Sequence, residues 1–364
     1  MIPVKNKITQ GQLMFFVIQS QVGVGILSLP YKLQVSAKGG AWISALIAGF
    51  VVQVIILILC ALCKRFPNDT LYSFLPKITG DFLGNLLSFA YIGYFLLMGG
   101  AALSKFADVV GKWVLQETPR WALLLLALLT CMYLVKEDLR VIARVFVIST
   151  FTIIVMVVLS LMGYAHVNFS YIFPITEAGW GKIIKGANEA LFPLTGYETI
   201  LVIYPFVEGK SGGKLKAVSL GNLVVTVFYA FEVFTSLIIF SPAVMPEVSE
   251  HLLFMLKGFS FQIIQRIDLI FLSLWIFIVT TSLVSWTYVA TVGFGRIFHR
   301  DEHKKAVPYA LFILFILALI AQNPAISDLY DQMAAIAHYS LIIGLPLILL
   351  SLTYMTRKRR TSVR

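Results

Sequence analysis

Charged residues are scarce in this sequence. Only 13% of its 364 residues are Asp, Glu, Lys or Arg, whereas 59% are hydrophobic, and the mean hydropathy is +0.87. Soluble domains average about 25% charged and about 45–50% apolar residues. A chain this apolar is not expected to form one or two water-soluble domains, and the lipid bilayer is its expected solvent.

Cysteine is scarce as well. Three cysteines, Cys60, Cys63 and Cys131, cannot build a disulfide framework. Cys60 and Cys63 form a C-x-x-C motif, but they end a long apolar run that has no βαβ pattern nearby. We therefore expect both to pack inside a helix rather than to carry out redox chemistry.

Signatures of catalysis are missing too. The sequence shows no nucleophile paired with a base, no metal-ligand cluster and no phosphate-binding loop. It therefore predicts a protein that is not an enzyme and that holds no metal and no cofactor. No small-residue cleavage site follows the first apolar segment, which we expect to be retained.

Long apolar runs dominate the rest of the chain. A bilayer core of about 30 Å requires about 20 apolar residues per helix. The candidate spans are 10–34, 39–63, 82–113, 119–135, 141–164, 183–206, 216–241, 265–296, 307–322 and 334–356. The predicted fold class is an all-α integral membrane protein with about ten transmembrane helices. Residues 64–81 form either an amphipathic helix on the membrane surface or a solvated loop.

The net charge of +11 is explained by an excess of basic residues on one side of the predicted membrane protein. When loops are assigned alternately to the two sides, most of the 29 lysines and arginines fall on one side. The positive-inside rule then places both termini in the cytoplasm, which agrees with an even number of spans. The basic run at 357–360 is interpreted as a topological anchor, with a site for a partner or for acidic lipid as the alternative.

Two of the predicted spans are interrupted near their middle. The first contains Gly23 and Gly25 among polar residues, and a glycine costs a helix interior about 1 kcal/mol relative to alanine. The sixth contains Pro193, which removes a backbone donor, and Gly196, which can take the conformation that restarts a helix. Unwound backbone at this depth is tolerated only where it is buried in protein or lines a watery cavity.

The two breaks occupy corresponding positions in the chain. They fall in the first span of each half if ten spans divide into repeats at 10–164 and 183–356 within a single transmembrane domain, 1–364. Paired interruptions of this kind indicate an inverted repeat with a binding site at the midplane. Helix N-termini suit a carboxylate and freed carbonyls suit an ammonium, so the pair complements a zwitterion such as an amino acid. Ordinary kinks without a ligand are the alternative.

Several side chains near the breaks are candidates for the site. Glu198 directly follows the second break and is a possible proton or coupling site, or a structural hydrogen-bond acceptor. A second intramembrane acid, Glu232, lacks a motif, and a structural role is favoured. Spans three and eight contribute the candidates Met98, Ala101, Trp286 and Thr287, and hydroxyl groups are dense at 280–287, where they serve helix packing or line a cavity.

Three segments together resemble one known family. They are Ile8-Thr9-Gln10-Gly11-Gln12, the run QVGVGILSLP from Gln21 to Pro30, and the run FPLTGYE from Phe192 to Glu198. These segments and the total length resemble the B subunits of the spore germinant receptors, the endospore germination permeases of the amino acid-polyamine-organocation superfamily. The resemblance implies a leucine-transporter-like five-plus-five fold in which helices 1 and 6 are broken.

The resemblance also implies a function and partners. It implies a subunit in the spore inner membrane that binds a small germinant, commonly an amino acid, and signals germination to a larger membrane A-type subunit and a lipoprotein C-type subunit. Carried over by position, the ligand site consists of Gly23, Val24, Gly25, Ala101, Leu194, Thr195, Gly196 and Thr287, with Met98 and Trp286 shaping it. These segments contain no Asp or Arg for a charged ligand, which favours a neutral one.

Two other functions remain open from the sequence alone. An amino-acid permease coupled to protons or sodium has the same broken spans, and Glu198 serves as a proton site in either case. A water or ion conduit is the third possibility, with the polar residues of spans one, six and eight as its lining.

Overall fold

The computed structural model describes residues 7–259, 266–298 and 302–361, and these residues form helices without any extended sheet. A single parallel bridge joins Ile8 to Val207. The helices are α1 (Gln10–Gln21), α2 (Gly25–Ala37), α3 (Ala41–Arg65), α4 (Leu71–Thr79), α5 (Asp81–Trp113), α6 (Arg120–Val135), α7 (Leu139–Leu161), α8 (Trp180–Leu191), α9 (Ile200–Ile203), α10 (Ser211–Ile239), α11 (His251–Lys257), α12 (Ile267–Phe298), α13 (His303–Ile320), α14 (Pro324–Ala337) and α15 (Leu345–Thr361).

Seven helical stretches among the described residues are long and apolar enough to cross a membrane. They are Gly25–Arg65, Asp81–Trp113, Leu139–His166, Ser211–Ile239, Ile267–Phe298, His303–Ile320 and Ala325–Tyr354. The predicted all-α, multi-pass membrane protein is therefore confirmed. Helical residues also overlap each of the ten predicted spans, but the count of ten stays a prediction. Fewer stretches than ten meet the length and hydropathy required of a span because the two breaks divide their spans into short helices and α6 is itself short.

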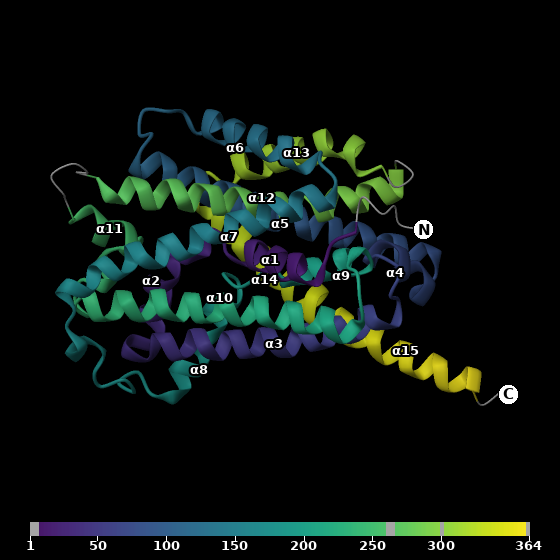
Figure 1. Ribbon diagram of the computed structural model, residues 1–364, viewed down its shortest axis with the longest axis horizontal. Coiled ribbons are helices and arrows are strands. Elements are labelled where there is room, and N and C mark those ends of the chain that lie inside the picture. The colour runs from purple at the N-terminus through teal and green to yellow at the C-terminus, as the bar shows by residue number, and fades with distance from the viewer. Residues whose placement is uncertain (1–6, 260–265, 299–301, 362–364) are drawn as a thin grey trace.

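The long helices run side by side along the horizontal axis of Figure 1, with α6, α12 and α13 on one side and α3 and α8 on the other. The short helix α1 lies in the middle and contacts α7, α10 and α12. Its residues from Phe16 to Gln21 are all buried. The two outer layers thus enclose the first break, which directly follows α1.

Side-chain exposure follows the expected lipid contact. Large apolar side chains point outward, such as Phe50, Ile148 and Tyr133, which are 70%, 73% and 80% exposed. In water such an apolar surface would be an aggregation hazard, whereas in a bilayer it meets its solvent. Cys60 and Cys63 are buried free cysteines in α3, as predicted for packing inside a helix.

The segment between the second and third predicted spans is a helix, so the loop alternative is wrong. Leu71, Phe74 and Leu75 of α4 are fully buried, and the helix packs against α5. The apolar face that suggested a membrane-surface helix is therefore covered by protein.

Candidate functional site

The first break separates α1 from α2 at residues 22–24. A capping box fixes the start of α1, since Thr9 and Gln12 exchange backbone-to-side-chain hydrogen bonds of 2.9 and 3.2 Å. The helix ends at Gln21, and Val22 is extended. Tyr229 of α10 holds the unwound turn because its hydroxyl donates to the Gln21 carbonyl at 3.1 Å and accepts from the Gly23 N–H at 3.4 Å.

The second break separates α8 from the short helix α9. Turns follow Leu191, and a 3₁₀ turn over Tyr197–Thr199 leads into α9. Gly196 has φ +126°, a backbone conformation that side-chain-bearing residues rarely adopt. The Thr195 hydroxyl donates to the Phe192 carbonyl at 2.7 Å and closes the turn. Both interruptions thus lie where proline and glycine predicted them.

The two breaks touch each other. A Cβ atom on Gly196 would lie 2.3 Å from the Ser20 carbonyl oxygen, and one on Gly25 would lie 2.6 Å from the Pro193 Cβ. Gln21 Nε2 donates to the Leu194 carbonyl at 2.9 Å and so ties the breaks together. Gly25 and Gly196 are therefore required for this close approach as well as for the interruptions themselves.

A cavity of about 40 Å³ lies against the two breaks. Its lining comes from α1, α2, α5, α12 and the second break: Ser20, Gln21, Gly23, Val24, Gly25, Ser28, Lys32, Met98, Ala102, Lys105, Phe192, Pro193, Thr195, Ser282 and Trp286. One water needs about 10–15 Å³, so this space holds roughly three waters. Pockets for drug-sized ligands measure about 300–1,000 Å³, so the cavity is small in this conformation.

Six of the ten predicted ligand-binding residues line this cavity, namely Gly23, Val24, Gly25, Met98, Thr195 and Trp286. Leu194 and Gly196 connect the breaks but do not line the cavity. The structure also does not bring Ala101 and Thr287 to it. Ala101 packs against Ala321 and Tyr330, and the Thr287 hydroxyl donates to the Leu283 carbonyl at 2.8 Å.

The helical period explains which positions reach the cavity. Neighbouring residues on a helix point about 100° apart, whereas residues three and four apart share a face. The cavity is lined by Met98, Ala102 and Lys105 of α5, with Ser282 and Trp286 of α12. Ala102 therefore takes the position predicted for its neighbour on α5.

Two lysines in the lining were not predicted as site residues. Lys32 follows Gly25 and Ser28 on one face of α2, a spacing that the sequence displays. Lys105 is expected from its place near a helix end to snorkel to the interface. In the structure its ammonium binds both carboxylate oxygens of Asp331 at 3.0 and 2.9 Å and lies 5.0 Å from the Phe192 ring centroid.

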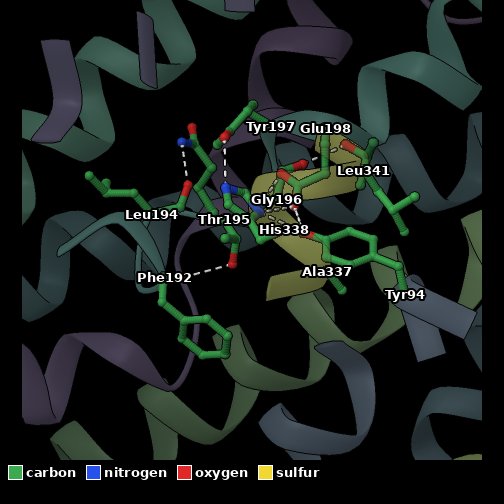
Figure 2. A network of polar contacts seen from close by, with 12 residues as sticks. Tyr94, Phe192, Leu194, Thr195, Gly196, Tyr197, Glu198, Ala337, His338 and Leu341 are labelled. Atoms are coloured by element: carbon green, nitrogen blue, oxygen red, sulfur yellow. Dashed lines mark hydrogen bonds and ion pairs between the residues drawn. The ribbon is translucent and has the colours of Figure 1, made fainter. Parts of the chain in front are cut away.

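Glu198 anchors a buried polar network behind the second break (Figure 2). Its carboxylate accepts from the Tyr94 hydroxyl and, at 2.7 Å, from the Gly196 N–H. His338 Nδ1 lies 2.9 Å from the Tyr94 oxygen, and His338 Nε2 lies 3.1 Å from the Tyr197 oxygen. We call these four side chains, Tyr94, Tyr197, Glu198 and His338, the Glu198 network.

One assignment of protons satisfies every hydrogen bond of the Glu198 network at once. Tyr94 has one hydroxyl hydrogen and donates it to Glu198, so it accepts from His338 Nδ1–H. His338 Nε2 of a neutral imidazole then accepts from the Tyr197 hydroxyl. In this arrangement one directional chain of hydrogen bonds runs from Tyr197 through His338 and Tyr94 to the Glu198 carboxyl group. Phe192 points away from this chain in Figure 2, toward the cavity that it lines.

A π-helix presents His338 to the Glu198 network. The segment His338–Gly344 joins α14 to α15, and such segments displace backbone carbonyls from the regular ladder. The Leu341 carbonyl accepts from the Tyr91 hydroxyl at 2.6 Å. The histidine carried no signal in the sequence because it lies inside an apolar predicted span without a motif around it.

The hydroxyl-rich part of α12 divides between packing and the cavity. Thr281 donates to Gln19 Oε1 at 2.6 Å, and Ser20 donates to Ser285 at 2.9 Å, so both fasten α12 to α1. Ser282 lines the cavity. Glu232 lies on α10 and does not line it; one carboxylate oxygen accepts from Ser160 at 3.0 Å, and the other has no hydrogen-bond partner among the described residues.

A second cavity of about 330 Å³ lies near the end of α2. It is lined by Gln34, Lys38, Tyr171, Glu177, Pro242 and neighbouring residues, and none of the predicted site residues contributes to it. Lys38 and Glu177 form an exposed ion pair there.

The fold and the cavity define a multi-pass helical membrane protein built around two broken helices that meet beside a partly enclosed cavity. A family model described as spore germination protein matches residues 7–326, which is nearly the whole chain. The chain therefore belongs to the spore germination protein family.

Curated relatives agree with this assignment at modest identity. Spore germination protein GerQB of Bacillus cereus is 27% identical over 327 residues, 88% of this chain and 89% of the relative. Spore germination protein YndE of Bacillus subtilis (strain 168) is 26% identical over 352 residues, 95% of this chain and 96% of the relative. Spore germination protein B2 of the same strain is 25% identical over 227 residues, 62% of this chain and 61% of the relative.

Proposed function

We propose that this protein is a membrane subunit of a spore germinant receptor that binds a small germinant in the cavity between its two breaks. The proposed germinant is a neutral amino acid, and its binding signals germination to partner subunits. The proposed partners are a larger membrane A-type subunit and a lipoprotein C-type subunit. Membership of the spore germination protein family supports this role.

The proposed architecture is a leucine-transporter-like fold of ten spans in the spore inner membrane. Repeats at 10–164 and 183–356 place one break at the start of each half, and the contact between the breaks supports this arrangement. Both termini are proposed to be cytoplasmic, as the distribution of basic residues indicates.

One observation carries the proposal: two interrupted helices, far apart in the sequence, meet at a partly enclosed cavity that polar side chains help to line. Membrane proteins tolerate unwound backbone at depth where it faces a cavity or protein. The cavity is too small for a large ligand in this conformation, which fits a small molecule and a change in shape on binding. A ligand shifts such an equilibrium only through its different affinity for the two conformations.

The test uses the purified protein in liposomes with each of the twenty L-amino acids in labelled form. We expect saturable binding of one or a few of them without accumulation inside the liposomes over time. The same amino acids should trigger germination of spores that carry the wild-type gene and not of spores from which it is deleted. If no amino acid binds, the proposed germinant class is wrong.

A permease is the second candidate, because the buried Glu198 network adjoins the second break and provides a carboxylate that a transported proton can occupy. Steady accumulation of a labelled amino acid that requires a proton or sodium gradient would favour the permease over the receptor. Binding without accumulation under every gradient would favour the receptor.

A further inference from the structure

Lys32 brings a positive charge to the cavity. Gly25, Ser28 and Lys32 lie on one face of α2, and all three line the cavity. Lys32 lies seven residues, or about 10 Å along the helix, beyond Gly25. Helical side chains lean toward the N-terminus of their helix, which suits a long side chain at this position that lines the same cavity as Gly25.

The ammonium group of Lys32 makes no ion pair and no hydrogen bond with any residue that the structure describes. Its acidic neighbours are Asp331, which already binds Lys105, and Glu189, which is exposed. The described residues that line the cavity include two lysines and no Asp or Glu. Since Asp331 compensates Lys105, Lys32 is the cation of this cavity that lacks a bonded counter-charge.

Gln21 presents the complementary group from α1. Its Nε2 donates to the Leu194 carbonyl at 2.9 Å and to Asn222 Oδ1 at 3.2 Å, so two acceptors fix the orientation of the amide. Its Oε1 is buried and has no donor among the described residues. A buried acceptor without a donor is unfavourable, and a ligand N–H group that reaches this oxygen as the cavity widens would satisfy it.

We propose that the cavity recognises a molecule with a free carboxylate, bound by Lys32, and a nitrogen donor, bound by Gln21 Oε1. This assignment rests on the proposed function and sharpens it, because it names the side chains that hold the two charged groups of an amino acid. Lys32 determines the requirement for the carboxylate. A zwitterion has no net charge, so its binding does not change the net charge of the cavity. Its carboxylate provides the counter-charge that the Lys32 ammonium lacks.

The test compares each L-amino acid that binds the wild-type protein with its α-carboxamide, which keeps the ammonium and loses the carboxylate charge. Charge-assisted hydrogen bonds are stronger than neutral ones, so we expect the carboxamide to bind wild type at least tenfold more weakly. The Lys32→Gln protein should bind the amino acid at least tenfold more weakly than wild type and should lose most of the discrimination against the carboxamide.

Matched variants separate recognition from structure. Lys32→Arg keeps the charge and should retain most of the discrimination, while Lys32→Met provides a second uncharged variant if Lys32→Gln does not fold. Lys38→Gln changes a lysine just beyond α2 that does not line this cavity, and it should leave both affinities unchanged.

Two negative results have different meanings. If the amino acid binds but Lys32→Gln or Lys32→Met discriminates against the carboxamide as strongly as wild type, the assignment of Lys32 is overturned while the proposed function stands. If amino acids and carboxamides bind wild type equally, the carboxylate requirement is overturned in the same way. If wild type binds no amino acid at all, the proposed germinant class itself fails.

Discussion

The cavity and the Glu198 network both adjoin the second break, and they differ in how completely their polar groups are bonded. In the network both carboxylate oxygens of Glu198 and both ring nitrogens of His338 have partners. In the cavity Gln21 Oε1 lacks a donor, and Lys32 has no bonded partner among the described residues. We interpret the unused bonding capacity of the cavity as the place for the proposed ligand, and the complete bonding of the network as a support that holds the second break in shape.

The second break adjoins both the cavity and the Glu198 network, so a change there should disturb both. We therefore expect the largest loss of stability from Gly196→Ala. A Cβ atom there would meet the Ser20 carbonyl, and φ +126° would be strained. Strain and overpacking should lower the free energy of unfolding by at least about 3 kcal/mol. Thermal unfolding in detergent measures the loss. Gly93→Ala is the control, since a Cβ atom there would have open space around it; equal stability of the two variants would contradict the packing described.

The second largest loss of stability is expected from a change in the Glu198 network that leaves the cavity lining intact. Tyr94→Phe removes the hydroxyl that links Glu198 to His338 and leaves buried polar atoms without partners. This should lower the free energy of unfolding by about 1–3 kcal/mol. The affinity of the cavity for an amino acid should change less than threefold, because Tyr94 does not line it. Tyr133→Phe on the exposed face is the control, and unchanged stability of Tyr94→Phe would argue against a supporting role.

A smaller effect is expected from Glu198→Gln. The amide oxygen accepts from the Gly196 N–H, and the amide nitrogen donates to Tyr94, which then donates to His338 Nδ1. The whole chain of hydrogen bonds reverses, with His338 Nε2–H donating to Tyr197. Because every group keeps a partner, the destabilisation should stay below about 1 kcal/mol and below that of Tyr94→Phe. A larger loss of stability in Glu198→Gln would mean that the negative charge itself is required.

Two serines on α12 give the finest comparison. Ser285 accepts a hydrogen bond from Ser20. Ser285→Ala should therefore lower the free energy of unfolding by about 1 kcal/mol, with little effect on ligand affinity. Ser282 lines the cavity and makes no hydrogen bond to a described residue, so Ser282→Ala should leave stability within about 0.5 kcal/mol. Ser282→Ala should instead weaken the affinity of the protein for the amino acid. Reversed results would place the ligand elsewhere.

Much of the fold was predictable because its determinants are local. Apolar runs fix the helices, and Gly23, Gly25, Pro193 and Gly196 fix the breaks, since each acts on its own stretch of backbone. The structure adds that Gly25 and Gly196 also permit contact between the breaks, which involves partners more than 160 residues away.

The side chains of the cavity were predictable only in part. The small and polar residues of spans three and eight and the family resemblance both pointed to Ala101 and Thr287, whereas the faces of α5 and α12 bring Ala102 and Ser282 to the cavity. Lys32 could have been predicted from the helical period of α2, because Gly25, Ser28 and Lys32 share a face. His338 was not accessible in this way, because a π-helix and contacts from distant helices place it beside Glu198.

The central claim is that the cavity between the breaks is the germinant site. The most direct measurement is equilibrium binding of the responding amino acid to wild type, Ala102→Val and Gly93→Val in nanodiscs. Ala102 lines the cavity and Gly93 has open space around it, so only the first valine narrows the site. We predict that Ala102→Val stays folded and binds at least tenfold more weakly, while Gly93→Val binds as wild type does. Wild-type affinity in a folded Ala102→Val protein would contradict a germinant site in this cavity.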